Sequence, residues 1–347
     1  MHNLTTRLYE SWHQAIANNL IMSQFEAMFD DDSNEKKWNQ GDIISYGIKR
    51  IENQLHYYAI NETQWRVIPG EVKEKRVDIG NSAHFICQFN AYRALRPGGK
   101  RRKLGRQPNI SDEASKCRFF CQNPSQSLSL LNRKPLLQVS LKHFVWNAYH
   151  NVAPLEKEGH FLWIPIHKTS SIDHILHFPQ RLSLEFLEDM VDLFQKLDQT
   201  ILFFNSLHAG ASVNHLHFQS VYHQHILPLE IAPTISKLSC ELLDFYPLSG
   251  LIFSQNKEVT PLWQLIYYLQ EKNIPFNLIF LGKRIILVPR NPDHEIVSEF
   301  PGDSIAALGV CGKLVTVDQA TYTHLNTQKI ESGLAKMILP VESLFEK

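Results

Sequence analysis

The 347-residue chain carries 35 lysines and arginines against 35 aspartates and glutamates, so its formal net charge is zero. A protein that binds nucleic acids in general usually shows a basic excess, and we therefore expect no nucleic-acid partner. The five cysteines are odd in number and scattered along the chain, which fits a reducing compartment better than a disulfide scaffold.

The first 80 residues are predicted to form a helical and extended peripheral region. Residues 5–29 have the apolar spacing of an amphipathic helix, and residues 42–80 alternate weakly, as peripheral strands do. The start of the chain lacks a basic segment followed by an apolar run, so we expect no signal peptide. No window approaches about 18 uninterrupted apolar residues, so we expect no membrane span and a soluble, cytoplasmic protein.

A basic segment follows at residues 93–106, which hold seven lysines and arginines and no acidic residue. Pro97-Gly98-Gly99 predicts a loop there. The loop is interpreted either as a solvated surface loop or as a clamp for phosphate groups. In the second interpretation Arg93 is the preferred phosphate ligand.

A regular pattern begins after residue 135. Residues 136–147 and 161–166 read as strands, residues 183–199 as a helix with one buried face, and residues 201–205 and 213–223 as two further strands. This order of strand, strand, helix, strand, strand is typical of an α+β layer with an antiparallel sheet.

The C-terminal part repeats this pattern more weakly. Residues 261–271 are helical in pattern, and residues 276–281 and 285–289 read as a hairpin around Gly282-Lys283. We expect the basic residues of this hairpin to be surface charges, with phosphate contacts as the alternative; they are Lys283, Arg284 and Arg290.

The most informative pattern is His215-x-His217-x-Gln219. Alternate residues share one face of a strand, so these three side chains are expected to point the same way. A turn of small residues (209–212) precedes them. Two imidazoles and an amide beside such a turn favour a nucleotidyl-transfer site, because a neutral His can attack phosphorus and Gln can only donate or accept hydrogen bonds. With 17 histidines in the chain, the alternative is a merely histidine-rich strand.

The His-x-His-x-Gln motif resembles the transferase branch of the histidine triad superfamily, and most of all the GDP-hexose phosphorylases. It is similar, more loosely, to galactose-1-phosphate uridylyltransferases and diadenosine tetraphosphate phosphorylases. Residues 85–93 (FICQFNAYR) resemble the opening of the catalytic domain in GDP-hexose phosphorylases, and residues 159–165 (GHFLWIP) resemble a strand start common to the superfamily. The resemblance covers about residues 85–229.

The resemblance implies an α+β fold of two histidine-triad-like repeats with antiparallel sheets. Residues 81–230 would form the catalytic repeat and residues 231–347 a second, degenerate repeat, since no second His-x-His-x-Gln occurs. A homodimer is left open.

The resemblance also implies a double displacement on a nucleotide sugar, with phosphate as the acceptor. His217 would be the nucleophile, and His215, Gln219, Ser212 and the turn that contains Ala211 would stabilise the charge on the phosphoryl oxygens. Rival interpretations are an adenylyl- or uridylyltransferase, and a nucleotide-binding sensor without activity. Gln219, in place of a third His, disfavours a hydrolase.

Two asparagines are candidate substrate ligands. Asn205 stands at the end of a predicted strand, where it either binds ribose or phosphate or caps the turn. Asn147 follows a strand at a position where relatives carry an Asn that contacts the nucleotide.

No cofactor is required for the chemistry that the resemblance implies, but a structural zinc ion is considered. In uridylyltransferases that bind zinc, two Cys, one His after a strand and the first His of the motif are the ligands. The corresponding set here is Cys117, Cys121, His167 and His215, a sound donor set for zinc. The spacing of the two cysteines departs from that pattern, and the alternative is reduced cysteines without a metal.

Overall fold

The structure, a computed structural model, describes residues 3–18, 36–38, 46–51, 54–59, 66–67, 73–79, 83–90, 111–123, 130, 133–151, 154–156, 159–168, 177–223, 225–237, 240–244, 246–254, 259–300 and 305–344. Within these ranges no helix combines the length and the apolar character needed to cross a bilayer.

The secondary structure mixes helices with antiparallel sheets. The helices are α1 (Leu4–Ala17), α3 (Leu184–Gln195), α4 (Pro228–Ile231), α5 (Thr260–Glu271), α6 (Ala307–Val310), α7 (Gln319–His324) and α8 (Thr327–Met337), with 3₁₀ turns at Ala114–Lys116 and Val341–Leu344. The central sheet contains β7 (Leu137–Ser140), β8 (Val145–His150), β9 (His160–Ile166), β10 (Thr200–Asn205), β11 (Phe218–Tyr222), β12 (Thr234–Lys237), β13 (Cys240–Leu243), β14 (Leu251–Ser254), β15 (Phe276–Leu281) and β16 (Arg284–Pro289).

Two smaller sheets complete the structure. A three-stranded sheet contains β5 (Lys73–Ile79), β6 (Ala83–Phe89) and β17 (Lys313–Thr316), and in it β17 pairs in parallel with β6. A four-stranded sheet contains β1 (Lys36–Trp38), β2 (Tyr46–Ile51), β3 (Gln54–Ala59) and β4 (Arg66–Val67).

The order of the central sheet shows two related halves. Its strands run β12-β13-β14-β16-β15-β10-β11-β9-β8-β7, and every neighbouring pair is antiparallel. Read outward from β10, the order is β10-β11-β9-β8-β7. Read outward from β15, it is β15-β16-β14-β13-β12, so each strand of one half has a counterpart at the same place in the other half. The helix α3 precedes β10, as α5 precedes β15. The predicted α+β fold is therefore confirmed, and the hairpin at residues 276–289 lies within the sheet as expected.

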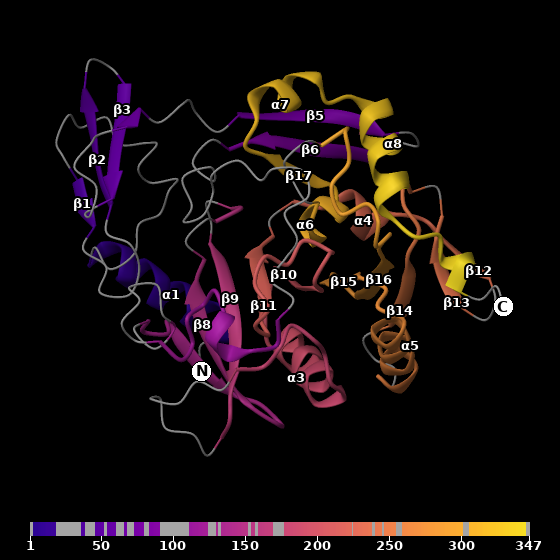
Figure 1. The fold of residues 1–347 in the computed structure, drawn as a ribbon, viewed down its shortest axis with the longest axis horizontal. Coiled ribbons are helices and arrows are strands. Elements are labelled where there is room, and N and C mark those ends of the chain that lie inside the picture. Colours follow the sequence, from indigo (N-terminus) through magenta and orange to yellow (C-terminus); the bar gives the residue numbers. More distant parts are fainter. Residues whose placement is uncertain are drawn as a thin grey trace.

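Each face of the central sheet carries its own layer of apolar side chains. On one face, buried residues of α1, α3 and α5 pack against inward residues such as Trp163, Phe204 and Phe280. On the other face, residues of the three-stranded sheet, α6 and α8 pack against Phe203 and Ile279. Figure 1 shows α3 and α5 on one side of the sheet and β5, β6, β17, α7 and α8 on the opposite side.

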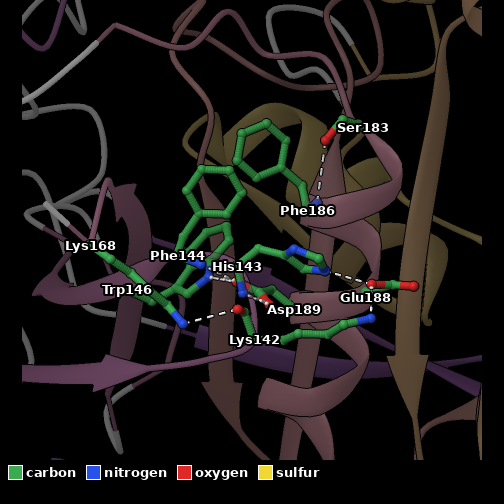
Figure 2. Close-up of polar contacts among 9 residues, drawn as sticks. All are labelled: Lys142, His143, Phe144, Trp146, Lys168, Ser183, Phe186, Glu188 and Asp189. Carbon is green, nitrogen blue, oxygen red and sulfur yellow. Dashed lines mark hydrogen bonds and ion pairs between the residues drawn. The ribbon is translucent and has the colours of Figure 1, made fainter.

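A buried carboxylate on α3 accepts hydrogen bonds from the turn between β7 and β8. Asp189, which is fully buried, accepts hydrogen bonds from the backbone N–H groups of His143 (3.0 Å) and Phe144 (2.9 Å) and from the Trp146 indole (2.9 Å). Figure 2 shows these bonds, together with the Ser183 side chain that caps the start of α3. Since a buried carboxylate is costly unless it is hydrogen-bonded, these donors explain why Asp189 is tolerated in the apolar layer.

Several predicted elements differ in their limits. The helix expected over 5–29 is α1, which ends at Ala17; residues 19–35 lie outside the described part. The strand expected over 136–147 is two strands, β7 and β8, because residues 141–144 form the turn fastened by Asp189. The helix expected over 183–199 ends at Gln195.

The strand expected over residues 213–223 begins only at Phe218, so His215 and His217 precede it. The reason is that the backbone of this segment is bonded to the 178–180 loop instead of to a strand. Leu216 N–H donates to the Phe178 carbonyl (2.6 Å), and His217 N–H donates to the side chain of Gln180 (2.9 Å).

Candidate active site

His217 has a defined tautomer and a defined reactive nitrogen. Its Nδ1 lies 2.7 Å from the backbone carbonyl oxygen of His215, which can only accept a hydrogen bond. Nδ1 therefore carries the hydrogen, and Nε2 carries a lone pair. Burial lowers the pKa of His217 to about 4, so the ring is neutral at pH 7. The arrangement is that of a nucleophilic imidazole.

The backbone of His217 is held by a residue that no sequence pattern indicated. Gln180 accepts from His217 N–H (2.9 Å), and its amide donates to the carbonyls of His217 (3.2 Å) and Asn205 (2.9 Å). Asn214 in turn accepts from the backbone N–H of Gln180 (2.7 Å). This buried amide thus joins the backbone of His217 to the end of β10.

Gln219 points its amide nitrogen at His217. The backbone N–H of Leu155 donates to Nδ1 of His160 (3.2 Å), which leaves Nε2 of His160 as a donor, and this nitrogen lies 2.9 Å from Oε1 of Gln219. The oxygen of Gln219 is therefore occupied, and its NH2 group faces Nε2 of His217 at 3.4 Å. A donor is thus aimed at the place where a phosphoryl group attached to His217 would carry its oxygens.

The turn between β10 and the motif is tightly packed on one side. Gly210 has φ +98°, and a Cβ on it would lie 2.7 Å from the Cβ of Ala306, so a glycine is required there. Ala211 is buried, whereas Ser212 is exposed. Asn205, at the end of β10, accepts hydrogen bonds from the Asn277 side chain (2.7 Å) and from Ala307 N–H (3.0 Å). On the side of the turn away from this packing, Ser212 is exposed to solvent.

A cluster of two thiols and two imidazoles lies beside His217. Cys117 Sγ is 3.5 Å from Nδ1 of His215, Cys121 Sγ is 3.6 Å from Nδ1 of His177, and the two Nδ1 atoms are 3.3 Å apart. All four ligand atoms lie within 4.8 Å of one another. Hydrogen bonds from Cys121 and His215 lower the pKa of Cys117. The hydrogen bond that Cys121 donates to Cys117, together with burial, raises the pKa of Cys121.

These separations match the edges of a tetrahedral zinc site. With Zn–N of about 2.05 Å and Zn–S of about 2.3 Å, an ideal tetrahedron has N–N edges of about 3.3 Å and S–N edges of about 3.6 Å. Three of the four predicted ligands, Cys117, Cys121 and His215, are in this cluster. The fourth member is His177 instead of His167, because the ring of His167 packs against Phe144 and Phe178.

The other candidate ligands have different positions. Asn147 is buried on β8, where its oxygen accepts from Gln138 (2.9 Å) and its nitrogen donates to the Tyr149 hydroxyl (3.2 Å), so protein groups occupy both ends of its amide. Arg93 and the rest of the 93–106 loop lie outside the described residues. Arg290, expected at the hairpin surface, is instead fully buried.

Comparison with known proteins shows that the chain is similar to phosphorylases of nucleotide sugars. Residues 205–347 match the family described as GDPGP1-like, C-terminal domain, and residues 160–222 match a domain of unknown function, DUF4922. GDP-L-galactose phosphorylase 1 of Arabidopsis thaliana is 32% identical over 70% of this chain and 55% of its own length. GDP-D-glucose phosphorylase 1 of Bos taurus is 26% identical over 84% of this chain and 77% of its own length.

The chain thus spans between about half and two thirds of the length of the Arabidopsis proteins that it matches. Among solved structures, the yeast Ap4A phosphorylase Apa2 in complex with Ap4A superposes with a TM-score of 0.59 at 14% identity, covering 98% of both chains. The same enzyme in complex with AMP gives 0.58 at 13% identity. These structures share the fold of this chain. The predicted resemblance to the GDP-hexose phosphorylases is confirmed by these relatives. The looser resemblance to diadenosine tetraphosphate phosphorylases is confirmed for the fold.

Proposed function

We propose that this chain, a histidine triad protein related to the GDP-hexose phosphorylases, is itself a phosphorylase that converts a GDP-hexose and inorganic phosphate into GDP and hexose-1-phosphate. The observation that carries the proposal is the neutral His217, whose Nε2 lone pair is faced by the NH2 group of Gln219. The names of the relatives indicate the substrate class.

In the first step, Nε2 of His217 attacks the α-phosphorus of the GDP-hexose. The bond from that phosphorus to the bridging oxygen breaks, and hexose-1-phosphate leaves with the electron pair. A sugar phosphate is a good leaving group, so the site needs no strong acid. The ring becomes cationic as it takes up the guanylyl group, and the His215 carbonyl that accepts from Nδ1–H stabilises this charge.

In the second step, an oxygen of inorganic phosphate attacks the same phosphorus, GDP is formed and His217 returns as a neutral imidazole. The NH2 group of Gln219 donates to a phosphoryl oxygen in both steps. Because its oxygen is held by His160, the amide keeps this orientation. Gln219 has no titrating proton, so it offers no general base to activate water.

We further propose that Cys117, Cys121, His177 and His215 hold a structural zinc ion. The donor set and its separations fit such an ion, which would supply a cross-link between three segments that are distant in the sequence. His215 then has two functions: its side chain belongs to the cluster, and its backbone carbonyl sets the tautomer of His217.

The proposed activity is tested with a panel of GDP-, ADP- and UDP-sugars and diadenosine tetraphosphate, each with and without phosphate. We expect GDP to form from a GDP-hexose only when phosphate is present. A substrate labelled in its guanylyl group should leave label on the protein that acid removes and base does not. A preference for another nucleotide would favour one of the rival transferases, and reversible binding without label would indicate a sensor. A cytoplasmic location and a homodimer stay predictions.

A further inference from the structure

A fully buried cation lies at the end of the second repeat, next to the turn of the candidate site. Arg290 follows β16 and has no exposed surface. Its guanidinium donates to the Asn277 side chain (2.8 Å) and to the backbone carbonyls of Ile305 (2.6 Å) and Met337 (3.2 Å). A buried charge is costly even when it is hydrogen-bonded, so this placement calls for a reason beyond packing.

The reason lies in the direction of the hydrogen bonds. A guanidinium can only donate, so the atom of Asn277 that faces Arg290 is the oxygen. Its NH2 group must then face the other way, where it donates to Oδ1 of Asn205 (2.7 Å) and to the carbonyl of Ala209 (2.8 Å). The backbone N–H of Ala307, which also cannot accept, donates to the same oxygen of Asn205 (3.0 Å). Two independent donors therefore fix the orientation of the Asn205 amide.

This orientation leaves one group of Asn205 available. Its Nδ2 makes no hydrogen bond to the described residues, and it is not among their buried polar atoms that lack a partner. The backbone of Asn205 is close to that of His217, because Gln180 donates to the backbone carbonyls of both residues. A donor with a fixed direction therefore stands at the end of β10, beside the turn that leads to the motif.

We propose that Arg290 and Asn277 are positioning residues, which hold the Asn205 amide so that its NH2 group donates to an oxygen of the bound nucleotide. This inference rests on the proposed function, and it gives the second repeat a part in the site. Asn205 and Asn277 are direct partners in the β10–β15 pairing, at the junction of the two halves of the sheet. The repeat without a His-x-His-x-Gln motif would thus act on the repeat that has one.

The substitution Asn277→Asp separates positioning from stability. The new carboxylate can still accept from Arg290, as an ion pair, so the fold is expected to be retained. Its second oxygen, however, would face Oδ1 of Asn205 and the carbonyl of Ala209, which are both acceptors. If the Asn205 amide turns over, the repulsion with its Oδ1 is relieved, but its NH2 group then faces the N–H of Ala307. In either orientation the Asn205 amide keeps an unfavourable contact, so the donor to the nucleotide loses its fixed direction.

We expect Asn277→Asp to raise the KM for GDP-hexose and the Kd for GDP by about tenfold to a hundredfold, which is the worth of one hydrogen bond to a charged group. The Tm and kcat should change little. Arg290→Met, which replaces the buried ion by an apolar side chain of similar length, is the second variant and should raise the same two constants. Ile279→Ala is the matched control, because it lies two residues along β15 on the same face and belongs to the buried layer.

The inference is overturned if KM and Kd of both variants stay within about twofold of the wild type, or if they change only in parallel with Tm, as in Ile279→Ala. Failure of the proposed function looks different, because the wild type would then not turn over GDP-hexose. In that case the inference is tested by comparing the Kd for GDP of each variant with that of the wild type. A wild type that does not bind GDP overturns both proposals.

Discussion

At His217, one hydrogen bond decides which ring nitrogen carries the lone pair. The His215 carbonyl takes the hydrogen of Nδ1, and the residues around His217 then direct a donor at Nε2 through Gln219. His160 gives that donor its direction, since it occupies the amide oxygen of Gln219. The tautomer and surroundings of His217 are thus defined by contacts among four residues, three of them within five positions of one another.

Replacing His217 by Ala is expected to reduce turnover to less than about a hundredth of that of the wild type, because the covalent route is lost. The protein should stay folded, since the bonds from Gln180 go to the backbone of residue 217. Steady-state rates and protein labelling measure this. His223→Ala is the control, because His223 is paired with Glu230 beyond the end of β11. Substantial activity in His217→Ala would mean that another group is the nucleophile.

Replacing Gln219 by His should lower phosphorolysis and raise the ratio of hydrolysis to phosphorolysis. An imidazole at this position can titrate and can assist water as the acceptor, whereas the amide cannot. The ratio of GMP to GDP formed from GDP-hexose at a fixed phosphate concentration measures the effect. An unchanged ratio in a folded variant would show that exclusion of water by the surrounding loops, and not Gln219, selects the acceptor.

At the scale of the elements, short segments far apart in the sequence meet around the motif. The 117–121 segment, the loop at 177–180 and residues 214–217 are joined by the thiol–imidazole cluster and by Gln180. None of these segments is a helix or a strand of the central sheet. Their relative positions therefore depend on side-chain contacts. A metal ion that cross-links such segments stabilises their arrangement in the folded state.

Purified protein is expected to contain about one zinc ion per chain, the stoichiometry of a Cys2His2 site. Cys117→Ser should lose the metal, and a strong chelator should lower the Tm of the wild type toward that of the variant. The matched control is Cys311→Ser, since Cys311 is a buried free cysteine outside the cluster. Metal-free wild-type protein with an unchanged Tm in chelator would contradict the zinc proposal.

The attachment of α8 should show a pH dependence through Glu299. Partial burial would raise the pKa of Glu299, but bonds from Lys336, from its own backbone and from Ser332 and Ser298 outweigh it and lower the pKa to about 2. A carboxyl whose pKa is lower in the folded protein than its ordinary 4.5 stabilises the fold above pH 4.5, and this stabilisation is lost as the pH falls toward 2.

Glu299→Gln should therefore lower the free energy of unfolding at pH 7 and much less at pH 3. Urea unfolding at the two pH values measures the difference. Glu331→Gln, an exposed position on α8, is the control and should change stability little at either pH. An equal loss at both pH values would mean that Glu299 acts through packing instead of through its charge.

At the scale of the whole molecule, the two halves share one sheet and both apolar layers. β10 and β15 are paired along their length, and the layer on either face contains residues of both strands: Phe204 and Phe280 on one face, Phe203 and Ile279 on the other. Separating the halves would expose these side chains and leave the hydrogen-bonding groups of two strand edges unpaired.

We therefore expect the part of the chain that forms this sheet to unfold in a single transition. Calorimetric and van't Hoff enthalpies should agree for that transition. A chain of residues 231–347 alone should show no cooperative unfolding. Two separate transitions, or a stable isolated C-terminal half, would show that each repeat has a core of its own.

The sequence by itself determined the features that depend on neighbouring residues. Helical and strand spacing identified α3, α5 and the β15–β16 hairpin, because apolar periodicity reflects the one face that each element buries. The spacing of His215, His217 and Gln219, with the small-residue turn before it, located the candidate site. These are local patterns, and no knowledge of the rest of the fold is needed to recognise them.

Only the tertiary structure decided which distant residues complete the site. His177 and not His167 joins the two cysteines, since the 177–180 loop, bonded to residues 214–217, brings His177 to the cluster. Gln180 belongs to no recognisable motif. Arg290 was predicted to be a surface charge, but it is buried because it follows β16, a strand inside the central sheet. The physical reason is that the hydrogen-bond partners and the burial of these residues depend on chain segments far apart in the sequence. Local sequence patterns do not identify such distant contacts.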